Sequence, residues 1–458
     1  MAQTPDEWLP ILAARLDARY PRIARLRRYA NGDADLPEMG PNLRASWVAF
    51  QRKARTDYGG LACGSMGDRL RLLSITIGKE ADSVESVSAR RIMRDNRMDI
   101  QFADMVDDYL TTGVGYFVAG HDAGAAVITR EIPEQFYAAT DPLRPWKARA
   151  AIKVWRDTDA GNDYALVWAT GQRQRYVRPS FAPSLVGGSD RQLRAVNGGG
   201  WVPDGDPELY DGAPPVVVFE RKSGKGLFEP HMDVIDRINL GKLQRLVIAA
   251  MLAFRQRALK AADGSPGLPD KDADGNDIDY TKVFESSPGA LWELPQGIDI
   301  WESQTTDITP LLAAEMADAR DFAAVTRTPL SAFTPDGANQ SATGATNSAA
   351  EQISQAKNDI ARLIPGLEVL NVYALRIEGV DLGDLTVEVE FENPAIVSMS
   401  EKYAAAAQAK AAGMTWDSIA RTILGWSPDQ IAQDSLARSE EQLSAMTLIQ
   451  ASGAPAVS

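Results

Sequence analysis

Histidine and cysteine, which act as bases, nucleophiles and metal ligands in many enzymes, are scarce in this chain. Its 458 residues include two histidines, His121 and His231, and one cysteine, Cys63. A Ser-His-Asp or Cys-His site needs a histidine beside its nucleophile, and no such motif surrounds either histidine. We expect His121 at a strand end and His231 at the start of a long helix, both in structural roles. Zinc sites built from cysteine and histidine are excluded by the same shortage.

Two glycine-rich segments resemble phosphate-binding loops only weakly. The first is Lys222-Ser223-Gly224-Lys225-Gly226. A Walker loop needs a glycine five residues before its Gly-Lys pair and Ser or Thr after it, and here those positions hold Phe219 and Gly226. The second, Gly113-Val114-Gly115, lacks the third glycine of a dinucleotide-binding turn. We reject both as nucleotide sites.

An acidic run gives the best match to a metal site. Asp270, Asp272 and Asp274 with Gly275 fit the first half of a calcium-binding loop, but the position of the closing glutamate holds Thr281. A solvated acidic turn is the preferred interpretation, and we predict no metal and no cofactor. Other paired carboxylates are plentiful, yet no pair is marked as special. A metal-dependent enzyme that processes nucleic acid or capsid therefore stays an open but disfavoured alternative.

Composition limits the class of protein. The formal net charge is −14, the pI is near 4.8, and 45% of residues are hydrophobic. A protein that grips DNA through its phosphates is usually basic, so tight sequence-reading DNA binding is disfavoured. There is no 18-residue apolar run and no secretory signal at the start, so we expect no membrane partner. Cys63 lies in Leu-Ala-Cys-Gly and is expected to be a small buried residue.

The pattern of elements predicts an α+β fold of several lobes. Thr4 caps a first helix that Pro21 interrupts and that stops at Asn31, and more helices are predicted at 45–57, 63–73, 83–95 and 99–112. Residues 114–221 hold short β-rich runs separated by turns, as in an antiparallel or mixed sheet. The strongest helix is 229–258, which at about 30 residues would span roughly 45 Å.

The second half of the chain alternates helices and loops. A polar loop at 263–279 and strand-like pieces at 283–284 and 290–294 precede a helix from Asp307 to just before Pro329. A small polar loop follows, and a helix then runs from 346 to 377, kinked near Pro365. One strand, 385–391, alternates cleanly, and helices are predicted at 399–412, 415–424 and 428–449.

The order of these segments resembles the portal proteins of tailed bacteriophages, in the branch common in actinobacteriophages. The resemblance covers roughly residues 20–435, and none of its motifs is catalytic. It rests on Val216-Val217-Val218-Phe219, Gly226-Leu227-Phe228-Glu229-Pro230-His231, Val234-Ile235-Asp236-Arg237-Ile238-Asn239 and Ala253-Phe254-Arg255-Gln256-Arg257-Ala258; on Thr328-Pro329-Leu330, Pro335 and Asn339-Gln340-Ser341-Ala342-Thr343-Gly344-Ala345; and on Arg94-Asp95-Asn96-Arg97-Met98-Asp99, Tyr109-Leu110 and Gly113-Val114-Gly115-Tyr116.

The resemblance implies a portal-type subunit whose parts follow one another along the chain. The expected parts are a mixed α/β wing at 1–228, a first stem helix at 229–258, a clip at 259–306, a second stem helix at 307–328, a tunnel loop at 329–345, a wing-crossing helix with its returning strand at 346–395, a helical crown at 396–450 and a disordered tail at 451–458.

The same resemblance implies a structural, non-enzymatic function at one capsid vertex of the virion, after assembly in the host cytoplasm. Subunits would form a ring of about twelve copies that conducts double-stranded DNA without sequence specificity during packaging and ejection. Its partners would be the major capsid protein, the terminase large subunit and the head-tail adaptors. A helical scaffold from outside phages is a further alternative.

Candidate residues follow from the same parts. The tunnel loop would present neutral hydrogen-bonding side chains that suit sliding contact with phosphates. The candidates are Asn339, Gln340, Ser341, Thr343 and Thr346 for the DNA-facing tunnel loop; Lys242, Arg245 and Lys357 as lumen basic residues; and Asp270, Lys271, Asp272, Lys282 and Trp292 for partner docking at the clip.

Overall fold

The computed structural model describes the chain as two compact units. Described residues are 4–37, 46–78, 83–180, 195–253, 257–261, 298–302, 307–333, 342–395 and 399–451, with a few positions between 268 and 278. Unit 1 comprises 1–34, 57–232 and 322–458, and unit 2 comprises 35–56 and 233–321. None of the described helices is both long and apolar enough to span a membrane.

The first helix of unit 1, α1 (Pro5–Ala30), begins and ends as its sequence predicts. Thr4 Oγ1 accepts a hydrogen bond from Glu7 N, and Glu7 Oε2 accepts one from Thr4 N, which forms a capping box. The expected interruption at Pro21 is wrong, because α1 continues through it. A buried face that includes Leu12 and Leu16 packs against a sheet, and this packing offsets the hydrogen bond that proline cannot donate.

The β-rich segment forms two antiparallel sheets, so the expectation of strands between 114 and 221 is confirmed. The smaller sheet has the order β10-β2-β3, and the larger has the order β4-β5-β6-β7-β8 with β9 also paired to β7. The bounds are β2 Val114–Asp122, β3 Ala125–Glu131, β4 Phe136–Asp141, β5 Arg144–Asp157, β6 Asn162–Ala169, β7 Gln172–Pro179, β8 Val202–Pro203, β9 Glu208–Leu209 and β10 Val216–Glu220.

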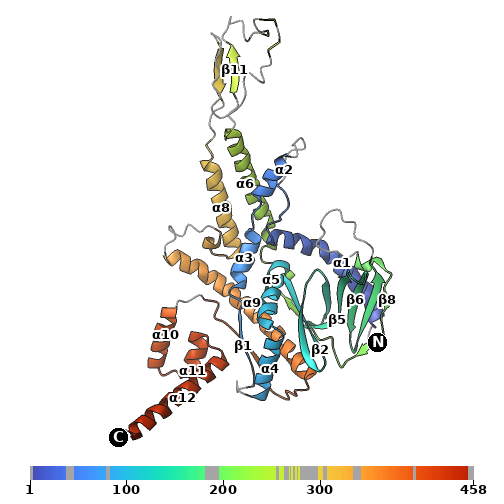
Figure 1. The fold of residues 1–458 in the computed structure, drawn as a ribbon, viewed down its shortest axis with the longest axis vertical. Helices are drawn as coiled ribbons and strands as arrows, with labels where there is room; N and C mark the ends of the chain where they lie inside the picture. The colour runs from blue at the N-terminus through green and yellow to red at the C-terminus, as the bar shows by residue number, and fades with distance from the viewer. Residues whose placement is uncertain are drawn as a thin grey trace. The chain divides into compact units, whose positions relative to one another are not determined.

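The core of unit 1 lies on both faces of the larger sheet. One face packs against α1 through a cluster that includes Trp8, Ile152 and Val167. The other face packs against the smaller sheet through a cluster that includes Tyr116 and Phe136. Because strands alternate their side chains, one sheet can serve both clusters. Figure 1 shows this sheet with α1 beside it.

A second group of helices surrounds a two-stranded sheet. The helices are α3 (Tyr58–Gly67), α4 (Val84–Asp95) and α5 (Met98–Thr112), and β1 (Leu72–Ile77) pairs antiparallel with β13 (Val387–Phe391). The predicted helix at 63–73 is therefore wrong beyond Gly67. The run Leu72–Ile77 is rich in β-branched residues, and its hydrogen-bond partners lie more than 300 residues later, where a local pattern cannot find them.

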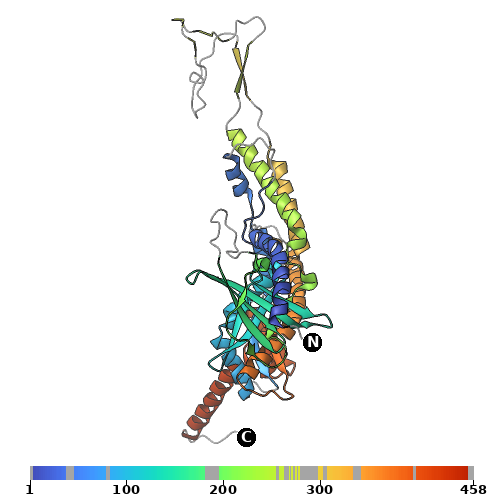
Figure 2. The ribbon, with the colours of Figure 1, turned by 90° about the vertical axis from the view of Figure 1, so that its right-hand side faces the viewer.

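Unit 2 contains α2 (Ser46–Ala54), most of α6 (Met232–Ala253), the first part of α8 (Thr309–Thr326) and the β11–β12 pair, Arg257–Ala261 with Ile298–Glu302. Figures 1 and 2 show α6 and α8 side by side. The prediction of one helix over 229–258 is wrong at its end, because Arg257 and Ala258 pair with β12. The 22 residues of α6 span about 33 Å.

Residues 35–56 belong with unit 2, although 1–228 was expected to form one wing. The buried side-chain oxygen of Asn239 in α6 explains part of this grouping. It accepts hydrogen bonds from Thr56 N at 3.0 Å and from Thr56 Oγ1 at 2.9 Å. A buried amide without such partners would destabilise the fold, so the segment before α3 is fixed to the long helix.

The longest helix, α9 (Ala342–Ile377), returns the chain to unit 1. It runs through Pro365 as one helix, with helical residues on both sides of the expected kink. Gly366 lets α9 approach the smaller sheet, because a Cβ there would lie 2.4 Å from the Phe219 ring. The C-terminal helices confirm their predicted ranges to within a few residues: α10 Met399–Ala411, α11 Trp416–Ile419, a π-helical turn Ala420–Leu424 and α12 Pro428–Ala451.

Candidate functional site

The helix α9 begins earlier than predicted, which changes the candidate tunnel loop. Asn339, Gln340 and Ser341 lie outside the described residues. Thr343 and Thr346 were expected in that loop but lie in the first turns of α9, which begins at Ala342. Ala342 and Ala345 favour a helix, whereas Thr343, Gly344 and Thr346 disfavour one, so residue type alone did not show where the loop ends.

Two of the predicted lumen cations share one carboxylate within unit 2. Lys242 Nζ lies 3.4 Å from Glu315 Oε1, and Arg245 Nε lies 3.3 Å from Glu315 Oε2. All three side chains are at most one-third exposed. One carboxylate therefore balances half of the positive charge that α6 was expected to offer to DNA. Lys357, the third candidate, is exposed on α9 of unit 1.

The contact between α6 and α8 is built from further ion pairs of the same kind. Arg237 of α6 lies 2.9 Å from Asp318 and 3.3 Å from Asp321, both of α8. Half of the Arg237 side chain is exposed, so each of these pairs stabilises the contact by about 0–1 kcal/mol. All the cations of these pairs lie on α6 and all the carboxylates lie on α8, so the pairs favour one pairing of helix faces.

Two of the five candidate clip residues, Asp270 and Lys271, belong to the described part of the chain. Asp272, Lys282 and Trp292, and the strand-like pieces at 283–284 and 290–294, lie outside the described residues. Lys271 forms an isolated antiparallel bridge with Asp277, and the carbonyl oxygen of Asp270 accepts a hydrogen bond from Ile278 N at 3.0 Å. Over the part of the chain that the structure describes, no group of three or more His, Cys, Asp or Glu could hold a metal ion.

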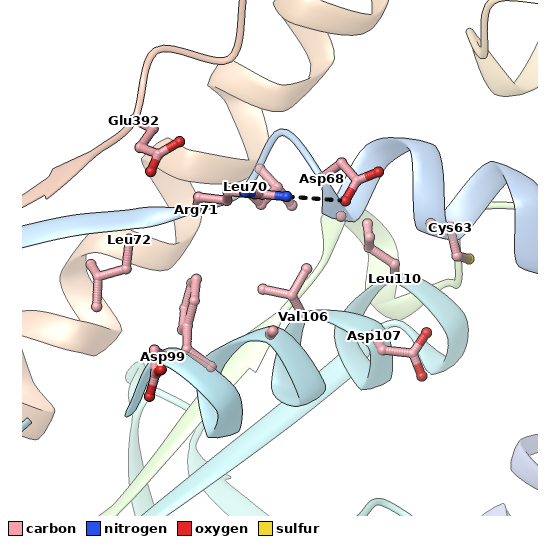
Figure 3. A pocket seen from close by; sticks show the side chains of 14 residues that line it. Cys63, Asp68, Leu70, Arg71, Leu72, Asp99, Val106, Asp107, Leu110 and Glu392 are labelled. Atoms are coloured by element: carbon pink, nitrogen blue, oxygen red, sulfur yellow. Dashed lines mark hydrogen bonds and ion pairs between the residues drawn. The ribbon is translucent and has the colours of Figure 1, made fainter. Parts of the chain in front are cut away.

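A cavity of about 460 Å³ lies between α3, α5 and β1 in unit 1. Figure 3 shows the Arg71–Asp68 ion pair at 3.5 Å, with Asp99 and Glu392 lying apart from each other. Burial raises the pKa of the Cys63 thiol to about 12, and Thr111 opposes this weakly through a 3.8 Å contact. A neutral buried thiol is not a nucleophile, so the expectation that Cys63 is a buried structural residue is confirmed.

The structure brings together a group of cations that the sequence reasoning missed. The rejected loop 222–226 lines a cavity of about 700 Å³ in unit 1. Arg327, just after α8, and Arg362, in the middle of α9, line the same cavity. His231 lies there too, and burial lowers its pKa, so it adds no charge near neutral pH. The two lysines in a glycine-rich turn were the available sequence signal.

The family model described as "Phage portal protein, SPP1 Gp6-like" matches residues 10–445. The chain belongs to the phage portal protein family. The portal subunit is therefore a ring-forming structural protein of a phage virion, and its mixed helix-and-sheet fold agrees with the predicted α+β portal class. The family is a structural one, in line with the absence of a catalytic motif in the sequence.

Solved structures similar to this portal chain come from gene transfer agent particles. A chain in the virion of a native particle is 12% identical with a TM-score of 0.46, and one in the neck of an empty particle with C6 symmetry is 12% identical with a TM-score of 0.47. Each alignment covers 88% of this chain and 99% of the other. A chain in the neck of a native particle with C12 symmetry is 13% identical with a TM-score of 0.40. That alignment covers 89% of this chain and 99% of the other. No curated protein matches the chain.

Proposed function

We propose that this portal subunit assembles into a ring of about twelve copies at one capsid vertex and forms the channel for DNA packaging and ejection. The observation that carries the proposal is the family match, which spans residues 10–445. Double-stranded DNA passes without sequence specificity. An acidic chain of net charge −14 suits passage, because it repels the duplex along most of the channel.

Different segments of the subunit serve docking, seating in the capsid and contact with DNA. Residues 259–306 form the clip that docks the terminase large subunit and later the head-tail adaptors, while the ring seats against the major capsid protein. The polar loop before α9, with Asn339, Gln340 and Ser341, faces the DNA, and Thr343 and Thr346 follow in the first turns of that helix. Assembly takes place in the host cytoplasm before the ring enters the virion.

The subunit itself catalyses no reaction in this proposal. Nucleotide hydrolysis belongs to the docked motor. The segment 222–226 agrees with this division, because it lacks the first glycine and the hydroxyl residue of a Walker sequence. The portal contributes a shaped conduit and docking surfaces.

Negative-stain imaging of the purified protein, together with its native mass, tests the proposal. We expect rings of about twelve subunits with a central hole. A small closed oligomer without a hole would contradict the conduit, and would reopen the search for an active site among the carboxylates. A monomer that forms rings when capsid protein is added would support it.

A further inference from the structure

The cavity beside the loop 222–226 is unusual for so acidic a protein. Five permanently charged cations line it, against one carboxylate, Asp359. Four of the cations are exposed. Within the described residues these four have no ion-pair partner within 4.0 Å, whereas Lys242 and Arg245 share Glu315. The exposed cations are Lys222, Lys225, Arg327 and Arg362, and we call them the cationic rim.

The buried end of the cavity is already balanced. Arg221 Nε lies 3.7 Å from Asp359 Oδ1, and the same oxygen accepts a hydrogen bond from the Tyr109 hydroxyl at 2.9 Å. Burial raises the pKa of Asp359, and Arg221 opposes that shift. Arg221 and Tyr109 engage one oxygen of Asp359, and the charge of Arg362 acts on the same carboxylate. The side chains of the cationic rim are themselves exposed to solvent.

The loop that carries the two lysines is held in a fixed shape. Arg22 of α1 donates to both carboxylate oxygens of Glu229, at 2.7 and 2.5 Å, and to the carbonyl oxygen of Gly224 at 2.8 Å. Glu229 Oε2 also accepts a hydrogen bond from Gly226 N at 2.8 Å. We call these four hydrogen bonds the Arg22–Glu229 clamp.

The backbone of the loop confirms that its shape is specified. Ser223 has a φ of +64°, which is uncommon for a residue with a side chain, and Gly224 follows with a φ of +59°. A Cβ on Gly113 would lie 2.6 Å from the Gly224 carbonyl, so only glycine there lets the loop approach α5. The Gly224 N–H donates a hydrogen bond to the Arg221 carbonyl oxygen at 2.8 Å, so the turn holds the two lysines in place and leaves their side chains to meet an anion.

We propose that the cationic rim binds phosphate groups of the DNA backbone. Two arginines offer planar forks that match phosphate oxygens, and two lysines add point charges. The contact would be independent of base sequence, because it reaches phosphates only. The choice of DNA as the source of phosphate rests on the proposed function, whereas the anion-binding geometry stands on the residues themselves.

The test compares two double variants that remove the same charge. Lys222→Ala with Lys225→Ala removes half of the cationic rim, and Arg15→Ala with Lys410→Ala removes two exposed cations on other elements. Binding of a fluorescein-labelled duplex of mixed sequence is followed by anisotropy over a range of salt concentrations. We expect the rim variant to lose affinity by about tenfold at 0.1 M salt and to flatten the slope of log K against log[salt] by roughly 1–2, with the control unchanged.

Each outcome decides the proposal. Equal affinity and slope for the two double variants would overturn it, and so would binding of inorganic phosphate at the rim without any effect of the variant on DNA. If the rim variant loses rings but its subunits bind DNA normally, the rim contacts an acidic surface of a neighbouring copy instead. Wild-type rings on negative stain, with DNA affinity unaffected by the rim variant, would refute this inference alone and leave the portal function standing.

Discussion

Replacing Arg22 with lysine should loosen the lysine-bearing loop without changing the charge of the protein. Lysine has one ammonium in place of a planar fork, so it cannot bond both oxygens of Glu229 and also reach the Gly224 carbonyl. Hydrogen bonds to charged groups contribute about 1.5–3 kcal/mol each when buried. Because the Arg22 side chain is 36% exposed, we expect a total loss of about 2 kcal/mol for Arg22→Lys.

That loss has two measurable consequences. The melting temperature should fall by about 4–8 °C, since 1 kcal/mol corresponds to roughly 2–4 °C in a large domain. Hydrogen exchange at the amides of residues 222–226 should accelerate by up to about 30-fold, because the loop opens more easily. Arg15→Lys, at an exposed position of the same helix, is the control and should change neither quantity. An Arg22→Lys protein with wild-type melting and wild-type exchange would refute the clamp.

Three further predictions concern separate parts of the chain. Bulky replacements of Gln340 and Ser341 should impair DNA packaging while rings still form, and normal packaging would exclude the tunnel-loop assignment. Asp163→Ala should lower the free energy of unfolding by about 3–5 kcal/mol, because it leaves the buried Arg156 and Arg178, at 2.7 and 3.3 Å, without their carboxylate. The control Asp159→Ala, at an exposed position, should change it by under about 0.5 kcal/mol. Equal melting temperatures for the two variants would disprove the prediction. Burial raises the pKa of Cys63 from 9.0 to about 12, so the native protein should resist alkylation of this thiol at pH 8.5, and rapid labelling would contradict its burial. The stability that the buried neutral thiol contributes is complete below pH 9 and is lost as the pH rises toward 12.

Local signals predicted much of this fold. The capping box at Thr4 and the stop at Asn31 set both ends of α1, and the β-rich runs between 114 and 221 became strands of two sheets. These features depend on the nearest residues along the chain, which a sequence displays directly. Predictions failed where a distant partner decided the outcome, as at Leu72–Ile77, which pairs with β13, and at Arg257, which pairs with β12.

The candidate site divides in the same way. The sequence by itself determined the portal class, through the order of its segments, and it excluded 222–226 as a Walker loop without assigning the segment another role. Only the tertiary structure decided that Lys242 and Arg245 share Glu315, and that Arg327 and Arg362 join the lysines around one cavity. The physical reason is that charge acts through space: whether a cation is balanced or free depends on neighbours that folding brings from far along the chain.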